Sequence, residues 1–162
     1  MKTAFGTRLT RLLRGGVLLS PLESWAVQTL VSSLPQELRL VVEAQFERYV
    51  LVQREFDGRA LNFYPRRREL RVGLQAPSLK MDLEDAPLIR IKMSVSEPSA
   101  TLHAVLSAVL GRAFSVSFSQ DVRPFAAASS FAVEEVVQSW RSNFSLAEVQ
   151  QAVARDVRNA RT

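Results

Sequence analysis

Few side chains in this chain could perform catalysis. The chain contains no cysteine, which excludes a disulfide, a thiol nucleophile and a zinc–thiolate site. Its single histidine, His103, lies beside the apolar stripe of a helix expected over residues 98–110, and no serine or acid stands at a motif spacing around it. We therefore expect a surface or core-edge histidine, although a triad requires only spatial proximity and the spacing leaves it open.

An acidic cluster is the feature that comes closest to a metal site. Asp82 and Glu84 share one face of an expected strand, Asp85 follows them, and the group could approach one cation. A solvated strand end explains the same residues, and we favour this interpretation. The chain also lacks a Walker loop and the glycine motif of dinucleotide-binding proteins. The sequence therefore predicts a protein that is not an enzyme and uses neither a metal nor a cofactor.

The N-terminal segment is strongly basic. The formal net charge is +5, and Lys2, Arg8, Arg11 and Arg14 all precede the first acid, Glu23. This segment fits a short amphipathic helix that could place its cations on lipid phosphates. We therefore expect these four residues to contact an anionic membrane surface. A transit peptide, a docked helix and a solubilising tail are the alternatives.

A second basic group consists of Arg66, Arg67, Arg68 and Arg71. These arginines could bind phosphates while Tyr64 or Phe63 stacks on a base. The same charges could instead protect a hairpin edge from strand-to-strand aggregation, and the aromatic residues alternate toward the core. An Arg-rich nucleic-acid-binding or ribonucleoprotein-associated module is therefore the alternative function.

Length and composition are those of one ordinary globular domain. The 162 residues are 47% hydrophobic and 23% charged, which suffices for a buried core. No apolar run reaches the length of a transmembrane helix. We divide the chain into a basic amphipathic segment at 1–19, an α+β domain at 20–142 and a C-terminal helix at 143–162.

Hydrophobic periodicity and capping residues predict the elements of this domain. A capping box starts a helix at Ser20, Pro35 starts a second helix that runs to about residue 51, and Asp57-Gly58 marks a tight turn. Period-two alternation predicts strands over residues 59–64, 69–74, 79–84, 89–95 and 114–118. Helical spacing predicts helices over 98–110, between Asp121 and Trp140, and from Ser145 onward. The expected architecture is α+β, with a five-stranded, mainly antiparallel sheet covered on one face by helices.

Large apolar side chains from both layers face each other in this arrangement. They could pack tightly, or the helices could stand off and leave a slot for an apolar ligand, and the sequence leaves both open. A small subunit of a larger assembly, with a filled core, is a third interpretation. The candidate groove residues are Trp25, Phe46, Tyr49, Leu61, Phe63, Ile91, Met93, Leu102, Leu106, Phe114, Phe118 and Phe125.

Several short segments resemble the sterol-carrier-protein family over roughly residues 20–135. They are Phe56–Leu61, Ala86–Ile91, Ser94–Ser96 and Thr101-Leu102. Phe118–Asp121 resembles a later strand and turn of the family, but Gln120 stands in place of a glycine. With Gln45–Arg48 and Leu18–Pro21, the chain is most similar to bacterial ubiquinone-biosynthesis accessory proteins that carry this domain.

The resemblance implies a non-catalytic protein with an apolar groove. It implies that the groove holds a prenylated quinone precursor or another lipid and presents it to soluble biosynthetic enzymes. It also implies a cytoplasmic location, peripheral at the inner membrane. The hydrophobic effect is consistent with such a role. Each methylene buried from water contributes about 0.8 kcal/mol, so a long isoprenoid tail is almost insoluble and needs a carrier that shields it from water.

Overall fold

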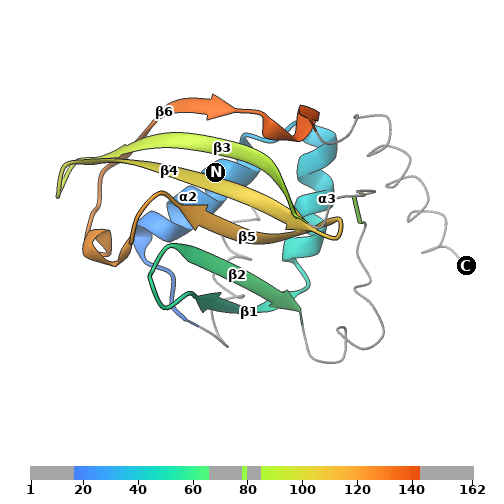
Figure 1. Ribbon diagram of the computed structural model, residues 1–162, viewed down its shortest axis with the longest axis horizontal. Coiled ribbons are helices and arrows are strands. Elements are labelled where there is room, and N and C mark those ends of the chain that lie inside the picture. Colours follow the sequence, from blue (N-terminus) through green and yellow to red (C-terminus); the bar gives the residue numbers. More distant parts are fainter. Residues whose placement is uncertain (1–16, 66–77, 80–84, 143–162) are drawn as a thin grey trace, which may run out of the picture.

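Two helices and a six-stranded antiparallel sheet form the part of the chain that the computed structural model describes, residues 17–65, 78–79 and 85–142. The helices are α2 (Pro21–Ser32) and α3 (Gln36–Phe46). The strands are β1 (Tyr49–Arg54), β2 (Ala60–Pro65), β3 (Asp85–Val95), β4 (Ala100–Val109), β5 (Arg112–Phe118) and β6 (Phe131–Val137). Short 3₁₀ turns, η2 (Arg123–Phe125) and η3 (Ser139–Ser142), lie on either side of β6. Both helices cover one face of the sheet, whose strand order is β1-β2-β5-β4-β3-β6 (Figure 1).

The expected α+β class is confirmed, but the expected number of five strands is wrong. The described residues alone contain six strands, of which β1, β4 and β6 were not expected as strands. The strands expected at 69–74 and 79–84 lie outside the described residues, apart from Leu79. The basic segment up to residue 16 and the helix expected from Ser145 also lie outside them.

Helix α2 begins as its sequence indicates. The Ser20 hydroxyl accepts a hydrogen bond from the Glu23 amide at 3.3 Å, and the Glu23 carboxylate accepts one from the Ser20 amide at 2.7 Å. The Glu23 side chain is buried and also accepts two hydrogen bonds from the Arg54 guanidinium of β1, at 2.7 and 2.6 Å. One carboxylate therefore caps the helix and fastens it to the edge of the sheet.

Helix α3 ends earlier than expected. The helical pattern predicted an end near residue 51, but α3 stops at Phe46 and the chain enters β1 at Tyr49. Val52 of β1 lies opposite Phe63 of β2, so the pairing of the two strands outweighs the helical spacing of the apolar residues. The turn expected at Asp57-Gly58 is confirmed, since it joins β1 to β2 and Gly58 has a φ of 71°.

The helix expected over residues 98–110 is wrong, because this segment is strand β4. Leu102 and Leu106 are four residues apart, a spacing that suits one face of a helix and equally one face of a strand. Every second residue from Leu102 to Ala108 is buried, which is the strand period. The strand lies between β3 and β5 and pairs with both, so the sheet decides the conformation. His103 consequently faces away from the helices.

The long helix expected between Asp121 and Trp140 is also wrong. Valine and phenylalanine, which favour strands, make up much of β6, and β6 pairs antiparallel with β3. Val133 lies opposite Met93 and Val136 lies opposite Ile91, while a bulge adds one residue to β6 between them. The bulge turns a strand spacing of two into a spacing of three, which imitates a helix in the sequence.

The hydrophobic core fills the space between the helices and the sheet. Phe63 and Met93 are fully buried, and Trp140 is 5% exposed. The rings of Phe46 and Phe63 meet edge to face with centroids 4.8 Å apart. These side chains occupy the place where a slot between the two layers would have to lie. Among the described residues, the arrangement therefore favours a packed interior.

Candidate functional site

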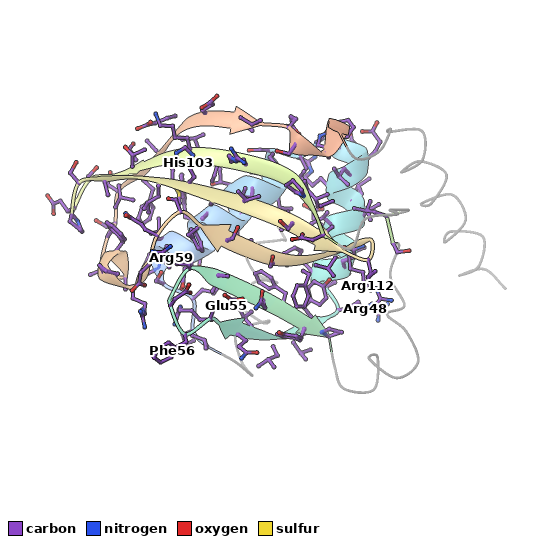
Figure 2. The ribbon with its side chains drawn as sticks, viewed as in Figure 1. Arg48, Glu55, Phe56, Arg59, His103 and Arg112 are labelled. Carbon is purple, nitrogen blue, oxygen red and sulfur yellow. The ribbon has the colours of Figure 1, made fainter. Side chains whose placement is uncertain are left out.

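An apolar pocket of about 420 Å³ lies at one end of the sheet. We call it the end pocket, and its lining consists of Tyr49, Phe63, Tyr64, Pro65, Ser78, Val109, Leu110, Arg112 and Phe114. Aromatic and aliphatic side chains dominate this lining, and Arg112 is the one charged residue among them. Figure 2 shows Arg112 at the end of the sheet beside α3. The volume lies within the range of about 300–1,000 Å³ that is usual for small-molecule sites.

The tight turn between β4 and β5 shapes one side of the pocket. Val109 pairs with Arg112, so Leu110 and Gly111 form a two-residue hairpin loop. Both have positive φ, 48° at Leu110 and 77° at Gly111. Such a conformation is unusual for a bulky residue and costs on the order of 1 kcal/mol or more. Leu110 is nevertheless 71% exposed, so the turn holds an apolar side chain toward solvent at the mouth of the pocket.

Gln45 of α3 holds this turn in place. Its side-chain amide donates to the Gly111 carbonyl at 3.1 Å and accepts from the Ala113 amide at 2.7 Å. The Gly111 carbonyl also accepts from the Leu79 amide at 2.8 Å. A Cβ on Gly111 would stand 2.0 Å from the Leu79 carbonyl oxygen, so the close approach requires glycine. The two hydrogen bonds of the Gln45 side chain are buried, and they hold the loop against α3.

Aromatic rings form the opposite wall of the pocket. The Tyr49 hydroxyl donates to the Ala113 carbonyl at 2.5 Å, and Tyr64 meets Phe114 at right angles with centroids 5.2 Å apart. Burial raises the pKa of the Tyr49 phenol well above its usual value, and the nearby Arg112 charge opposes this only in part. Tyr49 therefore remains a neutral hydrogen-bond donor at physiological pH. A permanently protonated phenol suits binding rather than proton transfer.

The structure brings together three of the twelve candidate groove residues. Tyr49, Phe63 and Phe114 line the end pocket. Trp25 lies elsewhere, with its ring 5.3 Å from that of Phe131. The remaining candidates belong to the buried core or its margin and are Phe46, Leu61, Ile91, Met93, Leu102, Leu106, Phe118 and Phe125. The described part of the site is thus smaller than the groove predicted from the sequence and lies at the end of the sheet.

Several candidates fall outside the described residues. They are Lys2, Arg8, Arg11, Arg14, Arg66, Arg67, Arg68, Arg71, Asp82 and Glu84. His103 is described and lies half-buried on the sheet face opposite the helices, where its backbone amide donates to the Ser119 hydroxyl at 3.0 Å. Within the described ranges, no three His, Asp or Glu side chains gather closely enough to hold a metal ion.

The sequence analysis missed the residues that build the pocket mouth. Leu110 and Gly111 separate two alternating runs, which is a hairpin signal, but the helix expected over 98–110 made Gly111 look like a helix end. Gln45 gives no local signal for its contacts with the turn, because Gly111 and Ala113 lie more than 60 residues further along the chain. Arg112 likewise becomes part of a site only through the hairpin that brings it back beside Val109.

Comparison with family models, curated proteins and solved structures gives no significant match. The resemblance to the sterol-carrier-protein family therefore stays a prediction from the sequence. Neither helix in the described ranges combines the length and hydropathy needed to cross a bilayer.

Proposed function

We propose that this protein binds an amphiphilic lipid without transforming it chemically. The apolar part of the ligand enters the end pocket, and its anionic or phenolic head group lies at Arg112. The observation that carries this proposal is an open pocket of about 420 Å³, in which the described lining residues are mainly aromatic and aliphatic and include the guanidinium of Arg112. A few polar groups in a mainly apolar concavity are the usual composition of a lipid or cofactor site.

The conformation of Leu110 supports this proposal. A two-residue loop with positive φ at both positions favours asparagine or glycine at its first position. Leucine there costs backbone energy and leaves an apolar side chain largely in water. Both costs would be offset if a ligand tail covered the side chain, because burying apolar surface contributes about 25 cal/mol per Å².

The resemblance stated above extends the proposal to a ligand class. The ligand would be a prenylated quinone precursor, the role would be support of ubiquinone biosynthesis, and soluble enzymes would receive the bound intermediate. Lys2, Arg8, Arg11 and Arg14 would meet an anionic membrane surface and hold the protein at the cytoplasmic side of the inner membrane. The size of the end pocket suits the ring and the first part of such a chain, so a short prenylated phenol is the appropriate probe.

The test is equilibrium binding of geranylated 4-hydroxybenzoate to delipidated protein, followed by native mass spectrometry and calorimetry. We expect Val109→Ser to weaken binding by about tenfold, equivalent to about 1.4 kcal/mol of lost apolar contact. Val105→Ser is the matched control, because Val105 lies on the same strand and the same sheet face but outside the end pocket. Arg112→Gln should weaken binding of the carboxylate-bearing probe and leave binding of geraniol unchanged.

Two results would overturn the proposal. Delipidated protein that binds neither probe would remove its basis. Equal losses in the Val109 and Val105 variants would place the ligand elsewhere. Salt-dependent binding of RNA, in a protein that binds neither probe, would instead favour the alternative of a nucleic-acid-binding module.

A further inference from the structure

Apolar side chains that stay partly or largely in water border the mouth of the end pocket. We call them the pocket rim, and they are Tyr64, Pro65, Val109, Leu110 and Phe114. Four of them are half-buried, whereas Leu110 is 71% exposed. Leu110 is therefore the most exposed apolar residue of the described lining, and it stands at the tip of the β4–β5 hairpin.

The hairpin presents Leu110 in a fixed position. The Gln45 side chain of α3 bonds to the Gly111 carbonyl at 3.1 Å and to the Ala113 amide at 2.7 Å. The Leu79 amide donates to the same Gly111 carbonyl at 2.8 Å. A loop that is already ordered loses little conformational entropy when a partner covers its tip.

Leucine at this position is costly to the fold. Its φ of 48° is unfavourable for a bulky residue, and asparagine or glycine is usual at the first position of such a loop. Its exposure adds the cost of apolar surface in water. A bound ligand offsets these costs only while it is present. The empty protein therefore gains free energy when another apolar phase covers Leu110.

Charge does not select the partner at this end of the sheet. Arg48 and Arg112 lie there (Figure 2). Glu47 directly precedes Arg48, and Asp85 lies opposite Val109 in the sheet. Both signs are therefore present near the pocket mouth, and the apolar rim is the feature that a partner can recognise.

The ligand class identifies the apolar phase that meets the rim. This step rests on the proposed function, in which the end pocket takes an amphiphilic lipid. Such a lipid resides in a bilayer, and its concentration in the surrounding water falls about fourfold with each methylene group of its tail. A pocket whose mouth touches the bilayer takes up the lipid without this passage through water.

We propose that Leu110 inserts into the surface of a lipid bilayer and brings the pocket rim against it, so that the ligand passes directly between the membrane and the end pocket. The contact is apolar and does not depend on the charge of the lipid. It differs in role from the expected contact of the basic N-terminal segment. That segment would hold the protein at an anionic surface, whereas Leu110 orients the pocket mouth toward the bilayer.

The test measures how fast full-length protein removes geranylated 4-hydroxybenzoate from neutral phosphatidylcholine vesicles. Vesicles are separated by rapid filtration at timed intervals, and the probe bound to the protein is quantified by mass spectrometry. Transfer by contact gives a rate that rises in proportion to protein concentration. Transfer through water gives a rate fixed by desorption of the probe from the vesicles. We expect the first behaviour.

Leu110→Asn should lower the concentration-dependent rate about fivefold, because the side chain that enters the lipid is lost. The protein is kept in large excess over the probe, so that a change in affinity does not affect the initial rate. Asparagine adopts positive φ readily, so the midpoint of thermal unfolding should not fall. Phe56→Asn is the matched control and should leave the rate unchanged. Phe56 is 98% exposed on the β1–β2 turn, at the opposite end of the sheet from Arg112 (Figure 2).

The outcomes separate this membrane contact from the proposed function. Protein that binds the probe in water, but removes it from vesicles at a rate independent of protein concentration, would overturn the membrane contact and leave the proposed function intact. An unchanged rate in the Leu110 variant, or an equal loss in the Phe56 variant, would also overturn the contact. Protein that does not bind the probe in water would overturn both.

Discussion

Replacing Gln45 by leucine should destabilise the fold through the turn that it holds. The substitution removes the acceptor of the buried Ala113 amide, and an unsatisfied buried donor costs about 1–3 kcal/mol. The Gly111 carbonyl loses the Gln45 donor but keeps the Leu79 amide at 2.8 Å, so a second full penalty does not arise. Leucine is similar in size to glutamine, so little cavity forms. We therefore expect a loss of about 2 kcal/mol.

Urea denaturation followed by far-ultraviolet circular dichroism measures this loss. With a denaturant slope of about 1–3 kcal/mol per molar, the midpoint should fall by about 1 M while the slope stays constant. Gln36→Leu is the matched control, since Gln36 lies exposed at the start of the same helix and should change stability by less than about 0.5 kcal/mol. A Gln45 variant as stable as the original protein would refute the reasoning that this side chain holds the turn.

Two further predictions concern buried polar groups. Burial raises the pKa of Tyr49 in the folded protein above that of a free tyrosine, about 10. Above about pH 10 the unfolded chain therefore loses a proton that the folded protein keeps. The free energy of unfolding should fall there by up to about 1.4 kcal/mol per pH unit. Tyr49→Phe should flatten that decline in urea titrations between pH 9 and 11, and identical pH profiles for both proteins would contradict the assignment. Glu23→Gln should cost about 2–3 kcal/mol, because it leaves the Arg54 guanidinium without its carboxylate. Thermal unfolding of this variant against Glu37→Gln measures the loss, and equal midpoints would count against the ion pair.

Local signals were reliable where a few neighbouring residues determine the geometry. The capping box at Ser20, the turn at Asp57-Gly58 and the alternation through β2, β3 and β5 all lie within short stretches, and the structure contains each of them. Capping and turn formation satisfy backbone groups within one or two turns of chain, so the sequence expresses them directly. The α+β class follows from these elements.

The periodicity was misleading where two conformations share a spacing. Leu102 and Leu106 fit both a helix and a strand, and the bulge in β6 spaces Val133 and Val136 like helical neighbours. Pairing with β3 and β5 resolves the first case, and pairing with β3 resolves the second. These partners are set by the whole sheet, and hydrophobic periodicity within one window contains no information about them.

The amino-acid sequence by itself determined that a capping box starts a helix at Ser20, that a turn falls at Asp57-Gly58 and that the protein combines helices with an antiparallel sheet. The tertiary structure decided that β4 and β6 are strands, that the side chains of the described residues pack closely between the helices and the sheet, and that an apolar pocket lies at the end of the sheet. The end pocket depends on Gln45 contacting Gly111 and Ala113 across more than 60 residues. These long-range contacts arise from the packing of α3 against β5, whereas caps and turns arise from backbone groups that are neighbours in the chain. The sequence therefore predicts the caps and the turn at Asp57-Gly58 but does not predict the end pocket.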